Sequence, residues 1–181
     1  MAEEDGRPEA VAAVSVDSAA EAAVLVAEAR DRVGNEMRTR EFLSKVEHDQ
    51  IVQAIREAES HTSGEIRVFI QRGKLNGDPL VAAQKKFYQL GMHKTRDRNA
   101  ALLFVAPRVH KFAVFGDKAV HEKCGEQFWQ RLVEGMRIHF QTEKFTRALV
   151  EGIKEIGKLL AAHFPRRSTS ASELPDDIVQ G

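Results

Sequence analysis

Apolar residues in the middle of the chain follow two different periods, and the two alternate along the sequence. Residues 65–71 alternate apolar and polar positions, which predicts a half-buried strand. Residues 100–106 are nearly all apolar, as is typical of a central strand covered on both faces. Residues 111–115 predict a third strand, because residues 107–110 have the length of a hairpin connection.

Apolar residues at spacings of three and four predict helices around these strands. The first helix would start at a capping box formed by Ser44 and Glu47, and the second at Asp78, which is a favourable N-cap before a proline. Two further helices are expected near residues 121–140 and 143–163. Strands interleaved with helices predict an α/β protein, a Rossmann-like three-layer α/β/α sandwich with a small mixed sheet and helices on both faces.

The two ends of the chain differ from this middle part. Residues 1–36 are rich in Ala and Glu and contain no aromatic residue, so we expect a disordered extension, with a transient amphipathic helix over residues 19–33. Residues 166–181 are expected to be a disordered tail. The folded domain is therefore predicted to span residues 37–165.

The overall composition excludes several classes of protein. The 181 residues carry a formal net charge of zero, so no bulk attraction to nucleic acid or anionic lipid follows. Cys124 is the only cysteine, which rules out a disulfide framework and suits a reducing compartment. The early apolar run at residues 22–27 is too short for a signal peptide or a membrane span. We therefore expect a soluble cytoplasmic monomer that neither binds nucleic acid nor inserts into a membrane.

The predicted topology brings polar side chains together at one edge of the sheet. A strand, a crossover helix and a second strand make a parallel pair, so Glu65 and Asp97 would lie at the same end. The hairpin reverses the third strand, and its end at Asp117 returns to that edge, followed by His121 in the next helix. These four side chains are expected to share one rim.

Carboxylates gathered in this way are typical of a hard-cation site. Glu65, Asp97 and Asp117 are the candidate ligands for Ca²⁺ or Mg²⁺, and His121 is a candidate general acid. Each residue also has a simpler role: Asp117 can cap a helix, while Glu65, Asp97 and His121 can be solvated. Arg98 and Lys118 would compete electrostatically with a bound cation.

No known catalytic motif accompanies this rim. The glycines at positions 73 and 77 lack the spacing and the Gly-Lys-Ser/Thr ending of a phosphate-binding loop. Cys124 and Arg131 are one residue too far apart for the phosphate loop of a cysteine phosphatase. No serine is accompanied by a nucleophile elbow.

Four segments of the chain resemble the TPM domain family, which includes thylakoid lumen phosphatase-like proteins linked to photosystem II repair. The segments are residues 51–59, 62–68, 98–106 and 116–122, and the resemblance extends from about Phe42 to Pro165. It implies a Rossmann-like α/β/α fold, and it implies phosphatase activity or divalent-cation binding in some relatives. The family's acidic loop corresponds to Asp97–Arg98–Asn99, where this chain has an arginine between the two and Ala100 in place of a glycine.

Two hypotheses stay open at this point. One is a noncatalytic module that binds a protein partner or a divalent cation at the rim. The other is a cation-dependent, acid-phosphatase-like phosphohydrolase in which the metal polarises a phosphoryl oxygen. The sequence favours the binding module, because the rim offers ligands but no pair of nucleophile and base.

Overall fold

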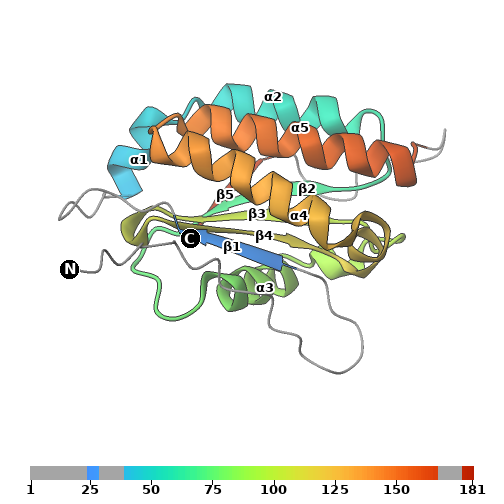
Figure 1. Cartoon of the computed structure of the whole chain (residues 1–181), viewed down its shortest axis with the longest axis horizontal. Helices are drawn as coiled ribbons and strands as arrows, with labels where there is room; N and C mark the ends of the chain where they lie inside the picture. The colour runs from blue at the N-terminus through green and yellow to red at the C-terminus, as the bar shows by residue number, and fades with distance from the viewer. Residues whose placement is uncertain (1–23, 29–38, 167–176) are drawn as a thin grey trace, which may run out of the picture.

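The structure has three layers, with a mixed sheet between helices (Figure 1). This computed structural model describes residues 39–166 and 177–181 together with the backbone of residues 24–28. The predicted α/β/α sandwich is confirmed. No helix among these residues combines the length and apolar content needed to span a membrane.

Within the described residues, the sheet has five strands in the order β1-β4-β3-β2-β5. The strands are β1 (Val24–Glu28), β2 (Ile66–Ile70), β3 (Ala101–Ala106), β4 (Lys111–Gly116) and β5 (Ile178–Gln180). As predicted, β2 and β3 are parallel, and β3 and β4 form an antiparallel hairpin. The starts of β2 and β3 and the end of β4 therefore lie at the same edge of the sheet.

The helices cover the two faces of the sheet unequally. On one face lie α1 (Thr39–Lys45), α2 (His48–Glu59), α4 (Lys118–Gln141) and α5 (Phe145–His163), and on the other lies α3 (Pro79–Gln89) (Figure 1). Asp78 caps α3 as predicted, since its carboxylate accepts a hydrogen bond from the Leu80 amide at 2.6 Å. Two short 3₁₀ turns, η1 (Met92–Lys94) and η2 (Pro107–Val109), precede and follow β3.

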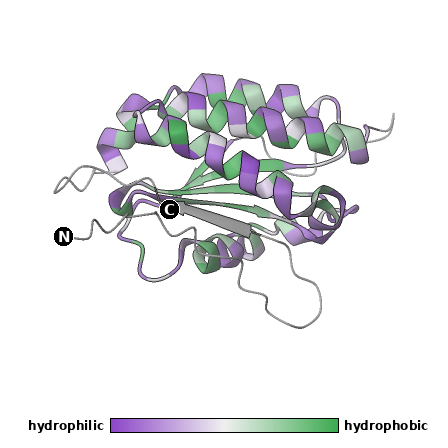
Figure 2. Ribbon diagram, viewed as in Figure 1, coloured by the Kyte–Doolittle hydropathy of each residue, from purple (hydrophilic) through white to green (hydrophobic). Residues whose placement is uncertain are grey.

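Apolar side chains fill both spaces between sheet and helices. The central strands β2, β3 and β4 are mostly hydrophobic, whereas the helices alternate hydrophobic and hydrophilic stripes (Figure 2). The larger cluster joins β2, β3 and β4 to α2, α4 and α5, with Trp129 and Ile153 among its buried members. The smaller one, under α3, contains four aromatic residues, Phe69, Phe87, Phe104 and Phe115.

The capping box predicted at Ser44 is wrong. Ser44 lies inside α1, and its hydroxyl donates to the Glu41 carbonyl at 2.7 Å instead of capping the next helix. α2 begins at His48 after Glu47, whose backbone amide donates to the Thr146 hydroxyl at 3.0 Å. A side chain from α5 thus satisfies an amide that the local sequence pattern assigned to Ser44.

Both chain ends contribute strands where we expected disorder. β1 pairs antiparallel with β4, so a helix through residues 19–33 is wrong for Val24–Glu28. β5 pairs parallel with β2, so disorder is wrong for Ile178–Gln180. The rest of the expected disordered ends, residues 1–23, 29–36 and 167–176, lies outside the described residues.

Candidate functional site

Three loops meet at the edge of the sheet where β2 and β3 begin and β4 ends. Backbone hydrogen bonds hold them together: the Ala101 amide donates to the Glu65 carbonyl, and the Asp117 amide to the Ala100 carbonyl, both at 2.8 Å. The Ala119 amide, in the first turn of α4, donates to the Arg98 carbonyl at 3.2 Å. The rim is therefore a rigid junction of backbone segments.

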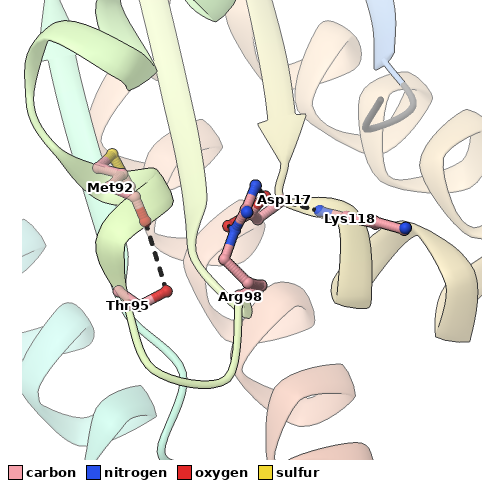
Figure 3. A network of polar contacts seen from close by, with 5 residues as sticks. All are labelled: Met92, Thr95, Arg98, Asp117 and Lys118. Atoms are coloured by element: carbon pink, nitrogen blue, oxygen red, sulfur yellow. Dashed lines mark hydrogen bonds and ion pairs between the residues drawn. The ribbon is translucent and has the colours of Figure 1, made fainter. Parts of the chain in front are cut away.

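Asp117 and Arg98 form a two-pronged ion pair at the centre of this rim (Figure 3). The Nε and Nη2 atoms of Arg98 each donate to a different carboxylate oxygen of Asp117, both at 2.8 Å. The Asp117 side chain is only 4% exposed. The hydrogen bonds to Asp117 raise the pKa of the Arg98 guanidinium above the usual value for arginine. Both carboxylate oxygens of Asp117 are thus engaged by a fixed positive charge.

Asp117 also fulfils its predicted role as a helix cap. One of its carboxylate oxygens accepts a hydrogen bond from the Lys118 amide at 2.8 Å, at the start of α4. Arg98 reaches this position from a left-handed backbone conformation, with φ of 51°. The Arg98 amide donates to the Thr95 carbonyl at 3.2 Å, which closes the loop before β3.

A second polar group joins Asp97, Ser63 and Asn99. The Asn99 side-chain amide donates to the Ser63 hydroxyl at 3.1 Å, and that hydroxyl donates to an Asp97 carboxylate oxygen at 3.3 Å. Asn99 is fully buried, whereas Asp97 and Ser63 are partly exposed. The Asn99 Oδ1 atom accepts no hydrogen bond within the described structure. A buried acceptor therefore belongs to a residue that is linked, through Ser63, to a partly exposed carboxylate.

The predicted metal ligands are divided between different environments. Glu65 is buried at the start of β2, Asp97 belongs to the Ser63 group, and Asp117 is paired with Arg98. Within residues 39–166 and 177–181, no three His, Cys, Asp or Glu side chains are arranged so that they could hold a metal ion. The metal assignment of Glu65, Asp97 and Asp117 stays a prediction.

His121 lies in the first turns of α4, close to the rim. Its amide donates to the Asp117 carbonyl at 3.0 Å, and its Nδ1 atom is buried without a hydrogen-bond partner in the described structure. Burial lowers the pKa of the imidazole below its usual value, which favours the neutral ring at pH 7. The general-acid role of His121 stays a prediction.

The cysteine near the rim is not activated. Burial raises the pKa of the Cys124 thiol to about 11. The thiol is therefore protonated at neutral pH and is a weak nucleophile.

Two glycines allow the close packing behind the rim. A β-carbon at Gly64 would lie 2.9 Å from a Leu160 methyl and 3.0 Å from the Asn99 carbonyl oxygen. A β-carbon at Gly116 would lie 2.7 Å from the Trp129 ring. The rim therefore rests directly on the core, which limits how far its loops can move.

Sequence reasoning placed the acidic side chains but missed their partners. Arg98 was expected to compete with a cation, and the structure shows it bound to Asp117. No role at the rim was predicted for Ser63, although Ser63 links Asp97 to Asn99. One signal in the sequence could have indicated these contacts: polar residues stand shortly before two apolar strands, β2 and β3. Polar groups that are buried at such positions need hydrogen-bond partners.

These features define an α/β/α sandwich protein with a polar rim at one end of its central strands. The family model of the TPM domain matches residues 37–159, and the chain belongs to this family. The chain is also similar to the BA42 protein from the psychrophilic bacterium Bizionia argentinensis sp. nov., whose NMR structure is known. The sequence identity is 34% and the TM-score 0.69, over 74% of this chain and 92% of that one. No curated protein matches the chain.

Proposed function

We propose that this TPM domain protein is a noncatalytic binding module whose rim takes a divalent cation, Ca²⁺ or Mg²⁺. The proposed ligands are the Asp97 carboxylate, the Asn99 Oδ1 atom and the Ser63 hydroxyl oxygen. Glu65 would contribute a nearby negative charge from the start of β2. Asp117 would act indirectly, by holding Arg98 away from the cation.

The buried Asn99 Oδ1 atom is the observation that supports this proposal most strongly. The Asn99 NH₂ group donates a hydrogen bond to the Ser63 hydroxyl, and that hydroxyl donates in turn to the Asp97 carboxylate. This direction of donation leaves the Asn99 oxygen as an acceptor without a donor among the residues that the structure describes. A buried unsatisfied acceptor costs about 1–3 kcal/mol, and a bound cation would offset that cost.

The ligand set predicts weak binding. Ca²⁺ takes six to eight oxygen ligands, and sites with few charged ligands bind with dissociation constants of about 10⁻⁴–10⁻³ M. Asp97 supplies the only carboxylate among the proposed ligands, and it is partly exposed. We expect water molecules to complete the coordination.

Calorimetric titration with Ca²⁺ and with Mg²⁺ tests the proposal. The wild-type chain should release or absorb heat, and Asp97→Asn should bind at least tenfold more weakly. Asp49→Asn is the matched control, because Asp49 is an exposed aspartate in the first turn of α2, away from the rim. If neither cation produces heat with the wild-type protein, or if both variants bind equally, the site is not at Asp97.

The phosphohydrolase is the second candidate, and the partly exposed guanidinium of Arg98 beside the rim favours it. Such a cation can meet a phosphoryl oxygen next to a metal. Turnover of an aryl phosphate with Mg²⁺ distinguishes the two functions. Turnover that Asp97→Asn abolishes and Asp49→Asn preserves would indicate an enzyme, whereas cation binding without turnover supports the binding module.

A further inference from the structure

The outer edge of β2 is covered by a very short strand from the far end of the chain (Figure 1). β5 pairs with β2 over three residues, with Val68, Phe69 and Ile70 opposite Ile178, Val179 and Gln180. Beyond the strand, the Gly181 amide donates to the Ile70 carbonyl at 3.3 Å, and the Arg72 amide donates to the Gly181 carbonyl at 2.6 Å. The β2 edge thus accepts an extended segment through its main chain.

The side chains of this segment alternate between the two layers of the core. Ile178 is buried and belongs to the larger apolar cluster, while Val179 packs against the smaller one. Gly181 lies against Phe69, because a β-carbon at position 181 would be 3.1 Å from a ring carbon. The edge therefore selects aliphatic residues at two successive positions and a small residue two positions later.

Polar contacts flank the aliphatic pair. The Arg72 Nη2 and Nε atoms donate to the Gln180 side-chain oxygen at 2.6 and 3.1 Å. Asp177 accepts from the Ile178 amide at 2.7 Å, and its carboxylate lies 3.2 Å from the His48 Nε2 atom. These contacts define a recognition pattern of acidic, aliphatic, aliphatic, amide and small residues.

Several features make this occupant easier to displace than an inner strand. Among the described residues, β5 pairs with a strand on one side only, and Ile178 is its one buried side chain. The contact between His48 and Asp177 is exposed. β5 also lies outside the residues that match the family model, whereas β2, β3 and β4 lie within them. The segment is therefore an appendage to the sheet of the family domain.

We propose that the outer edge of β2 is a strand-acceptor site for an extended segment of a partner protein with this residue pattern. Residues 177–181 occupy the site as an internal ligand. A partner segment adds to the sheet as a parallel strand after the internal ligand has left, because both use the same main-chain groups of β2. The bound segment of this chain shows which sequence the site accepts.

The full-length Ile178→Asp variant tests this proposal, since a buried carboxylate would release the internal ligand. The probe is a synthetic peptide with the wild-type sequence of residues 172–181. We expect the peptide to bind Ile178→Asp at least tenfold more tightly than it binds the wild-type chain. The same peptide carrying Ile178→Asp is the control and should bind neither protein.

A second variant localises the site on the acceptor. Adding Arg72→Met to Ile178→Asp removes the donor to Gln180 and should weaken peptide binding severalfold. Hydrogen exchange at the Arg72 amide in the wild-type chain should be slow, faster in Ile178→Asp, and slow again when the peptide is added. Circular dichroism confirms that the variants remain folded.

Three results would overturn the proposal. The first is a folded Ile178→Asp protein that does not bind the peptide. The second is equal binding by the wild-type chain and the variant, which would place the peptide elsewhere. The third is a wild-type dimer, seen by light scattering, that Ile178→Asp converts to a monomer, because the strand would then come from a second copy.

Discussion

The rim and the outer edge of β2 both carry polar side chains next to the sheet, but the paired carboxylate is buried at the rim and exposed at the outer edge. At the rim, the Asp117 carboxylate is 4% exposed and held by Arg98. At the outer edge, the Asp177 carboxylate is 64% exposed and lies beside His48. Buried polar groups must keep their partners, whereas exposed ones can exchange them with water. The rim is accordingly part of the folded core, and the outer edge is an exchangeable contact.

Arg98→Met should have the largest effect on stability, because it leaves Asp117 buried and without its counter-charge. We expect the free energy of unfolding to fall by about 3 kcal/mol, as measured by urea denaturation. Arg137→Met is the matched control, since Arg137 makes a similarly short two-pronged pair on α4 with Glu134, whose side chain is 55% exposed. The control should lose less than about 0.5 kcal/mol. Equal losses would show that burial does not distinguish the two pairs.

Ile178→Ala should have a smaller effect than its burial alone implies. The side chain is only 6% exposed, but β5 can leave the sheet, so the loss cannot exceed the free energy that docks the segment. We expect about 1 kcal/mol, against about 3 kcal/mol for Ile153→Ala in the centre of α5. Thermal unfolding of both variants measures the difference. A loss at Ile178 as large as that at Ile153 would mean that β5 unfolds together with the core.

The smallest predicted effect is on the pH dependence of stability. Because the pKa of His121 is lowered in the folded state, the unfolded chain binds the proton more readily. This residue therefore lowers the free energy of unfolding as the pH falls below the ordinary histidine pKa of about 6.5, and it contributes nothing well above that pH. His121→Asn should reduce the loss by less than about 1 kcal/mol in denaturation between pH 7 and pH 5. His163→Asn, at an exposed position, should leave it unchanged.

The central part of the fold could be predicted because local patterns and packing agree there. The strands at residues 66–70 and 101–106 combine β-branched or aromatic residues with apolar runs, and Asp78 stands before a proline. The edge strands could not be predicted in this way. β5 has only three residues, too few to show a period, and β1 lies in a segment whose alanines and glutamates favour helix. Pairing with β2 and β4 overrides that local preference.

The sequence predicted where the candidate site lies, but not which of its side chains pair with each other. Topology alone places Glu65, Asp97 and Asp117 near one edge, since parallel strands begin together. The choice of Asp117 as the partner of Arg98 depends on a left-handed residue in the loop, which the arginine itself does not signal. The link from Asn99 through Ser63 to Asp97 likewise depends on side-chain positions that only the folded core determines.

The order of strands in the sheet also bears on how the chain folds. The hairpin of β3 and β4 closes the shortest loop, with Ala106 opposite Lys111, and the crossover through α3 then adds β2. The two outer strands require far longer closures, because Val24 pairs with Phe115 and Val68 with Ile178. Closing longer loops costs more chain entropy, so we expect the sheet to assemble from its middle outwards. Until β5 is paired, the partly assembled sheet would expose the β2 edge to any other extended chain in its surroundings.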